Sequence, residues 1–176
     1  MDIAMIGLGK MGANMARRLL QGGHRVVGLD QAPDAAKKLA EEVKIVPAAS
    51  LAEAVKLLPT PRVLWVMVPS GAPTEAVITE LAGLLAPDDV IIDGGNTYYK
   101  DDMRRAAALK PKGIHYVDAG TSGGVWGAER GYCLMIGGDE TIVRRIDPIF
   151  AALAPDIAEA PRTPGREKVG GTAEHG

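Results

Sequence analysis

The chain lacks the features that would assign it to several specialised classes of protein. It has one cysteine, Cys133, among 176 residues, which excludes an internal disulfide and a cysteine-rich zinc site. Its three histidines are scattered without metal-ligand spacing. The longest apolar runs, such as VLWVMV from Val63, are far shorter than the roughly 20 residues that cross a bilayer.

The chain also lacks an excess of either charge, because it has 20 basic and 22 acidic residues and a net charge of −2. No basic block indicates a nucleic-acid partner, and no acidic tail is present. The N-terminus has no basic lead and its apolar stretch is broken at once by glycines, so it does not resemble a signal peptide. We expect a cytoplasmic protein that binds neither nucleic acid nor membrane.

Short apolar runs alternate with amphipathic stretches along most of the chain. The pattern predicts strands over 2–7, 24–30, 43–48, 62–68, 89–95, 114–120 and 132–138. It predicts helices over 9–23, 33–42, 50–58, 73–85, 98–110 and 139–153. Continuously apolar strands between helices are typical of a doubly wound (Rossmann) α/β fold, with a mostly parallel sheet covered on both faces. We expect this domain to span residues 1–154, with 155–176 a linker or disordered tail rich in Pro, Gly and charge.

A G-x-G-x-x-G motif, formed by Gly7, Gly9 and Gly12, follows the first predicted strand and opens the first predicted helix. In this context Gly7 makes a tight turn, Gly9 admits a pyrophosphate, and Gly12 lets the helix approach the strand. The phosphates would lie at a helix N-terminus, where free amides and the helix dipole favour anions. The alternative is a tight turn that binds nothing; the context favours dinucleotide binding.

Asp30 ends the second predicted strand, about 20 residues after the glycine motif. A carboxylate there accepts hydrogen bonds from the adenosine ribose hydroxyls and repels a 2′-phosphate. The next residues, Gln31 and Ala32, provide no arginine to hold such a phosphate. The sequence therefore favours NAD over NADP, the alternative being an aspartate that only caps the following turn.

Three segments, IGLGKMGANMARRL, IIDGGNTYYKDD and YVDAGTSGGVWGAERGYCLMIGG, resemble the 6-phosphogluconate dehydrogenases of the β-hydroxyacid dehydrogenase superfamily. The resemblance is closest to the short bacterial form, which is often NAD-linked, and extends along the whole chain. It implies oxidative decarboxylation of 6-phosphogluconate to ribulose 5-phosphate and CO2, in the pentose phosphate pathway, by a homo-oligomeric enzyme.

The resemblance also assigns roles to particular residues. It implies that the cofactor is bound by Gly7, Leu8, Gly9, Lys10, Met11, Gly12, Asp30, Val68, Pro69, Ser70 and Asn96. It implies that the substrate is bound by Asn96, Ser122, Gly123 and Gly124. All are predicted at the carboxyl ends of strands, where open α/β sheets bind ligands.

The catalytic groups of the family are expected to lie outside this chain. In the family a lysine base and a glutamate acid follow a G-x-G-H-x-x-K-x-x-x-N-x-x-E pattern, and no such segment occurs in the 176 residues. We therefore expect no catalytic residue here, and the family's C-terminal helical domain is expected to be absent as well. The resemblance thus implies a cofactor domain that turns over poorly or not at all alone.

Several other residues have structural interpretations. We expect Cys133 to be a buried thiol, Trp65 to lie in the core and Glu129–Arg130 to form an ion pair. Trp126 lies beside the proposed substrate turn, as part of the pocket or as its cover. Four aspartates are interpreted as caps or turn formers: Asp93, Asp101, Asp102 and Asp118.

Two functional alternatives remain open. One is another β-hydroxyacid dehydrogenase, of the hydroxyisobutyrate or tartronate semialdehyde type, which the VWGAERG stretch disfavours. The other is a non-catalytic module that senses NAD(H), which the missing lysine segment would fit.

Overall fold

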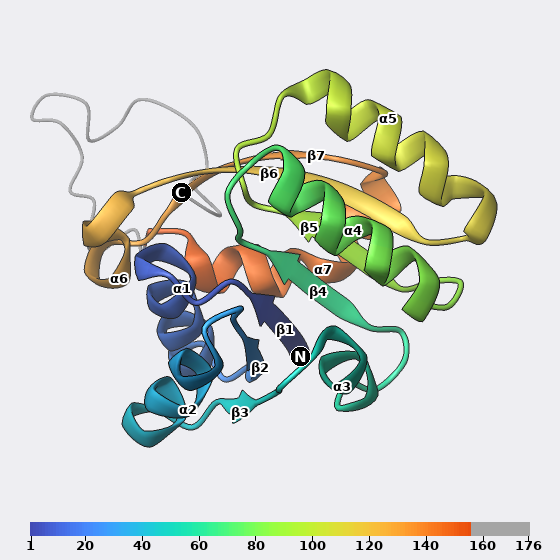
Figure 1. Cartoon of the computed structure of the whole chain (residues 1–176). Helices are drawn as coiled ribbons and strands as arrows, with labels where there is room; N and C mark the ends of the chain where they lie inside the picture. The colour runs from blue at the N-terminus through green and yellow to red at the C-terminus, as the bar shows by residue number, and fades with distance from the viewer. Residues whose placement is uncertain (156–176) are drawn as a thin grey trace, which may run out of the picture.

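The computed structural model describes residues 1–155, so all but the first residue of the tail predicted over 155–176 lies outside the described residues. Seven strands form one sheet in the order β3-β2-β1-β4-β5-β6-β7 (Figure 1). The strands are β1 (Asp2–Ile6), β2 (Arg25–Leu29), β3 (Val46–Pro47), β4 (Val63–Val66), β5 (Val90–Asp93), β6 (His115–Ser122) and β7 (Cys133–Gly137). The strands from β3 to β6 run parallel, as predicted for a doubly wound α/β fold.

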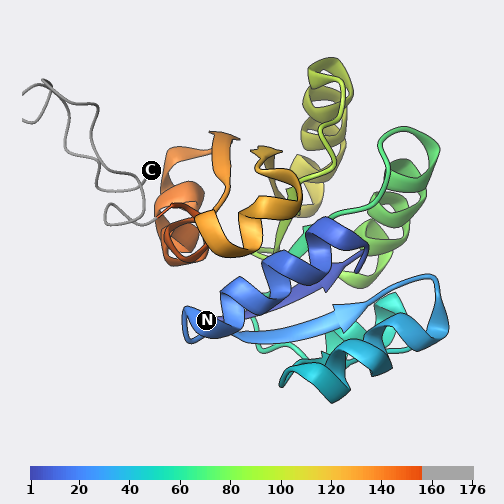
Figure 2. The same ribbon diagram turned by 90° about the vertical axis from the view of Figure 1, so that its left-hand side faces the viewer.

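Helices cover both faces of the sheet. They are α1 (Lys10–Gln21), α2 (Pro33–Glu42), α3 (Leu51–Lys56), α4 (Ala72–Leu84), α5 (Tyr99–Leu109), α6 (Gly127–Arg130) and α7 (Glu140–Leu153). In Figure 2 α1 lies in front, with α6 and α7 beside it. The first of two buried clusters joins α1, α2 and α7 to one face through residues such as Met15, Leu39 and Ile146. The second joins α3, α4 and α5 to the other face through residues such as Val55, Leu81 and Leu109.

Local signals explain where several elements begin. Ser50 caps α3 by accepting a hydrogen bond from the Glu53 amide at 3.1 Å, while the Glu53 carboxylate accepts from the Ala49 amide at 2.7 Å. Asp139 caps α7 in the same way, at 2.9 Å from the Thr141 amide. The predicted strand over 62–68 ends earlier, at Val66, so Val68, Pro69 and Ser70 lie in the loop that follows it.

The last strand, β7, departs from the parallel pattern. It pairs antiparallel with β6 and forms the edge of the sheet. Its outward face is open, and the Cys133 side chain is exposed. The prediction of a buried thiol was therefore wrong, because an edge strand covered on one side exposes residues that a central strand would bury. Trp65 on the central strand β4 is fully buried, as predicted.

Candidate functional site

The predicted ligand-binding segments meet at one edge of the sheet. The strand order reverses between β1 and β4, and in open α/β sheets the crevice at such a switch point binds ligands. The loops that follow β1, β2, β4 and β5 and the end of β6 all lie at the carboxyl ends of these adjacent parallel strands. Four contacts, described next, join them into a continuous rim.

The first contact joins the glycine motif to the loop after β4. Gly7 has a φ of +96°, and a Cβ at this position would lie 2.4 Å from the Met67 carbonyl oxygen. A Cβ at Gly12 would lie 1.9 Å from the Gly7 carbonyl oxygen. Only glycine therefore allows the turn to close and α1 to approach it.

Gly9 differs from the other two glycines because a Cβ there would meet nothing within 4 Å. The space above this residue is open, and Gly9 and Lys10 are both exposed. The N-terminus of α1 has no side-chain cap and no acidic residue in its first turn. Free amides at an uncapped helix start suit an anion, so the loop fits the pyrophosphate of a dinucleotide.

Asp30 provides the second contact, between the end of β2 and the glycine loop. Its Oδ2 accepts a hydrogen bond from the Leu8 amide at 2.6 Å, and its Oδ1 accepts from the Ala32 amide at 2.8 Å. The residue therefore caps the following turn, as the structural alternative predicted, and also holds the glycine loop. Each carboxylate oxygen keeps a free lone pair, so these contacts leave it able to accept from a ribose.

The third contact joins the loops after β4 and β5. A Cβ at Gly95 would lie 2.9 Å from the Val68 carbonyl oxygen, so the two loops touch through a glycine. The buried Thr74 hydroxyl donates to the Pro69 carbonyl at 2.9 Å and fixes the β4 loop to the start of α4. Val68 is half-buried and Ser70 is exposed at this edge.

Asn96 provides the fourth contact, between the β5 loop and the end of β6. It has a left-handed φ of +53°. Its Oδ1 accepts from the Thr121 amide at 2.9 Å and its Nδ2 donates to the Thr121 carbonyl at 3.2 Å. The side-chain amide thereby positions Ser122, which starts the predicted substrate turn, and retains one donor for a ligand.

The substrate turn itself is exposed and rests on Tyr132. Ser122, Gly123 and Gly124 are all exposed, and a Cβ at Gly123 would lie 2.8 Å from the buried Tyr132 ring. A short 3-10 helix (Gly124–Trp126) follows and leads into α6. The backbone of this turn is therefore free to offer amides to a ligand.

The predicted ion pair between Glu129 and Arg130, which follow the turn in the described part of the chain, is not observed. Within residues 1–155 no ion pair joins Glu129 to Arg130, because the Arg130 guanidinium lies over the Trp126 ring at 5.6 Å from its centre. Arg18 instead donates to the Glu129 carbonyl at 3.5 Å. Trp126, two residues after the turn, is 61% exposed.

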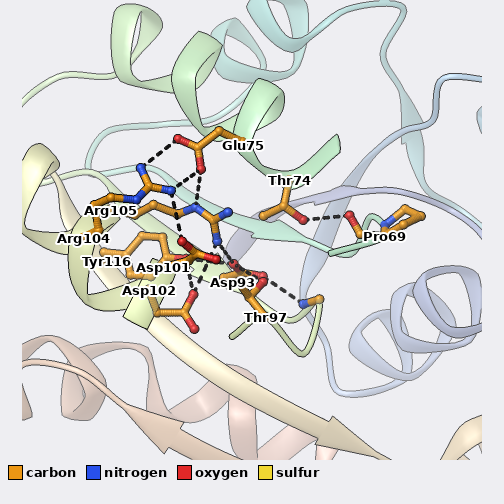
Figure 3. A network of polar contacts seen from close by, with 11 residues as sticks. Pro69, Thr74, Glu75, Asp93, Thr97, Asp101, Asp102, Arg104, Arg105 and Tyr116 are labelled. Carbon is orange, nitrogen blue, oxygen red and sulfur yellow. Dashed lines mark hydrogen bonds and ion pairs between the residues drawn. The ribbon is translucent and has the colours of Figure 1, made fainter. Parts of the chain in front are cut away.

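A buried polar network beneath the β5 loop was not predicted (Figure 3). Asp93 is fully buried at the end of β5, where its Oδ1 accepts from the Gly95 amide at 2.9 Å and its Oδ2 from the Thr97 hydroxyl at 2.9 Å. Arg105 and Tyr116 also contact that Oδ2, at 3.3 Å and 2.7 Å. Asp93 is thus the turn former that was expected, but it also anchors the loop that carries Asn96.

The same network buries Asp102, which was interpreted as a helix cap. Its Oδ1 lies 2.7 Å from the Tyr116 hydroxyl and 3.6 Å from Arg105. Burial, together with the charges of Asp118 and Asp93, raises the pKa of Asp102 to about 6. Burial and the Asp93 charge also raise the pKa of Asp118.

Glu75 on α4 closes the network at the surface. Hydrogen bonds from Arg104 lower the pKa of Glu75 to about 2, and Arg105 adds a further contact at 2.9 Å. Sequence reasoning missed this cluster because its members come from four elements that only the folded sheet brings together.

Comparison with known proteins identifies the family of this site. The family described as the NAD binding domain of 6-phosphogluconate dehydrogenase matches residues 2–160. The chain belongs to this family. The chain is therefore an NAD(P)-binding domain of the dehydrogenase type, as its resemblance predicted.

Individual relatives of this dehydrogenase domain differ in cofactor and substrate. The NAD(+)-dependent, decarboxylating 6-phosphogluconate dehydrogenase of Haloferax volcanii is 39% identical over 154 residues, covering 88% of this chain and 50% of that protein. The NADP(+)-dependent enzyme of Bacillus subtilis is 37% identical over 165 residues, covering 92% and 35%. The structure of Mycobacterium tuberculosis 3-hydroxyisobutyrate dehydrogenase has a TM-score of 0.78 at 33% identity, covering 86% and 51%.

The dehydrogenase domain spans about half the length of the first curated relatives that it matches. Over residues 1–155 no helix is long and apolar enough to cross a membrane. In the same part of the chain no group of three His, Cys, Asp or Glu side chains could hold a metal ion.

Proposed function

We propose that this chain is the cofactor-binding domain of an NAD-dependent 6-phosphogluconate dehydrogenase. The observation that carries the proposal is the continuous rim of four loop contacts around the open face of Gly9, at the switch point of the sheet. Such a rim is the dinucleotide-binding crevice of a doubly wound fold.

Different residues of this chain fit different parts of the cofactor. The amides of Gly9, Lys10, Met11 and Gly12 face the pyrophosphate, and Leu8 is held in place by Asp30. Val68, Pro69, Ser70 and Asn96 border the nicotinamide half. When bound, the nicotinamide accepts a hydride from the substrate.

Asp30 is the basis for proposing NAD rather than NADP. Its carboxylate is partly exposed at the end of β2, and the exposed Gln31 and Ala32 beside it offer no cation for a 2′-phosphate. Overall similarity does not decide the question, since relatives of both cofactor types are 37% identical to this chain. The local charge at Asp30 therefore carries this part of the proposal.

For the substrate we propose 6-phosphogluconate, held by Asn96, Ser122, Gly123 and Gly124. The remaining amide donor of Asn96, the Ser122 hydroxyl and the glycine amides suit a polyhydroxy acid. The general base and general acid of the decarboxylation come from a part of the enzyme outside this chain, so these residues bind and orient without transferring protons. We also propose that the complete enzyme is a homo-oligomer.

A second candidate is a 3-hydroxyisobutyrate-type dehydrogenase, which the structural likeness to the Mycobacterium tuberculosis enzyme supports. Ligand-observed NMR on this chain with NADH present distinguishes the two substrates. The proposal expects saturation transfer to 6-phosphogluconate and none to 3-hydroxyisobutyrate at equal concentration. The reverse result would assign the second candidate.

Cofactor choice is tested by paired fluorescence titrations of the chain with NADH and NADPH at the same salt. We expect NADH to bind at least about tenfold more tightly than NADPH. The Asp30 carboxylate accepts hydrogen bonds from the adenosine ribose of NADH, and it repels the 2′-phosphate that NADPH carries on that ribose. Tighter binding of NADPH would overturn the specificity, and binding of neither would overturn the proposal for this chain.

A further inference from the structure

The Tyr116 hydroxyl lies within hydrogen-bond distance of two carboxyl groups but has only one proton to donate, which distinguishes the buried network from an ordinary set of ion pairs. The Tyr116 oxygen lies 2.7 Å from Asp93 Oδ2 and 2.7 Å from Asp102 Oδ1. Both distances are those of hydrogen bonds, but a phenol has one proton to donate. The second bond therefore requires a proton on one of the two carboxyl groups.

The partners of the two carboxyls show which one holds that proton. Asp93 accepts three other hydrogen bonds, from Gly95, Thr97 and Arg105, as an ionised carboxylate does. Oδ2 of Asp102 is buried and has no hydrogen-bond partner among the residues that the structure describes. A buried carboxylate oxygen without a hydrogen-bond donor is costly, so the neutral acid belongs on Asp102.

The charge balance around Asp102 leads to the same assignment. The groups that face it are Asp93 from β5, Tyr116 and Asp118 from β6, and Arg105 from α5, while Glu75 of α4 reaches it through Arg105. Arg104 neutralises Glu75 with two hydrogen bonds, at 3.0 Å and 2.7 Å. Asp93 and Asp102 then share the buried guanidinium of Arg105, and Asp118 adds a further negative charge near Asp102, so a proton on Asp102 reduces the repulsion among the three carboxyls.

We propose that Asp102 is protonated in the folded protein. Its proton completes a hydrogen-bond chain from Asp102 through Tyr116 to Asp93, and this chain positions the Gly94–Thr97 loop. With the proton present, Asp102 donates to Tyr116, and Tyr116 donates to Asp93. When the proton leaves, two carboxylates compete for one phenolic hydrogen, and Asp93 holds Gly95 and Thr97 less firmly. Asp102 is a positioning residue that acts on Asn96 from below.

The expected effect on cofactor binding rests on the proposed function of the loop. The protonation of Asp102 does not depend on that function. Because the pKa of Asp102 is raised to about 6, its proton leaves within the range from about pH 5 to 8. We expect the affinity for NADH to fall about two- to tenfold as the pH rises through this range, the equivalent of one weakened hydrogen bond.

The test combines three readouts on the whole chain, between about pH 5 and pH 8. Carbon-13 NMR of the aspartate carboxyls follows the Asp102 proton, the Gly95 amide shift follows the loop, and fluorescence follows NADH binding. We expect all three to change with one midpoint. In Asp102→Asn, whose amide donates to Tyr116 at every pH, the Gly95 shift and NADH affinity should lose that dependence.

Asp101→Asn is the matched control, since Asp101 precedes Asp102 on α5 and its side chain is 44% exposed. It should keep the original pH profile. If Asp102→Asn does not fold, Tyr116→Phe breaks the same chain and should also remove the dependence.

An Asp102 carboxyl that titrates with the exposed aspartates, or a Gly95 amide that ignores its titration, would overturn the proposal. If both change as expected but NADH binds at no pH, the proton and the loop response stand and the proposed cofactor function fails. If NADH binds with an affinity independent of pH, the link from the loop to the cofactor fails.

Discussion

At the scale of single residues, the three glycines of the first loop have separable roles. Gly12→Ala should lower the free energy of unfolding by about 1–3 kcal/mol, because its Cβ would lie 1.9 Å from the Gly7 carbonyl oxygen. Gly9→Ala should lower stability by less than about 1 kcal/mol, since nothing lies within 4 Å of its Cβ and the cost is that of replacing glycine at a helix N-cap. The same Gly9→Ala change should weaken NADH binding about tenfold or more, because the methyl occupies the pyrophosphate space. Urea denaturation and NADH titration check both variants; full NADH affinity in a folded Gly9→Ala chain would contradict this assignment.

Asp30 gives a second prediction at this scale. Asp30→Ala removes the charge that excludes a 2′-phosphate, so the ratio of NADH to NADPH affinity should fall about tenfold or more. Loss of the Leu8 contact affects both cofactors alike, which is why the ratio is measured. Asp34→Ala, an exposed change in the first turn of α2, should leave the ratio as it is. An unchanged ratio in Asp30→Ala would show that specificity arises elsewhere.

At the scale of elements, α4 contains a glycine that the fold does not require. Gly83 lies exposed in the last turn of this helix, and a Cβ there would meet nothing within 4 Å. Gly83→Ala should raise the free energy of unfolding by up to about 1 kcal/mol through helix propensity. Thermal unfolding measures this change, and NADH affinity should stay constant because α4 meets the rim only at its other end. A destabilised variant would contradict the prediction.

The order of elements could be predicted from the sequence, and their pairing only in part. Apolar runs and caps identified all seven strands and the six longer helices, because these signals are local. The antiparallel direction of β7 and the exposure of Cys133 depend on where the strand lies in the sheet. Likewise the motifs located the rim, whereas the Asp93–Tyr116–Asp102 network depends on the register that pairs Asp93 with Asp118.

At the scale of the whole molecule, Asp102 and Glu75 give stability opposite dependences on pH. The folded state binds a proton on Asp102 that the unfolded chain has released above its ordinary pKa of 3.8. This group's contribution therefore declines as the pH rises from about 4 to about 6. Glu75, with its pKa lowered to about 2, stabilises the fold above the ordinary value of 4.5, and this contribution is lost as the pH falls toward 2.

Urea denaturation at a series of pH values checks this pair of trends. Asp102→Asn should remove the decline between about pH 4 and pH 6 while keeping the loss of stability in stronger acid. Glu75→Gln should reduce that acid loss and leave the decline in place. A decline that persists in Asp102→Asn would show that another group, such as Asp118, holds the proton.

If a dinucleotide lies across the rim with its pyrophosphate on the start of α1, its binding changes the surroundings of the amides in these loops. Amide proton–nitrogen NMR of the chain, recorded while NADH is added, locates those changes. We expect the largest shifts at Leu8 to Gly12, Val68, Ser70 and Asn96, with none at the distant Gly83 amide. Shifts gathered at another surface, or no shifts at all, would contradict this placement of the dinucleotide.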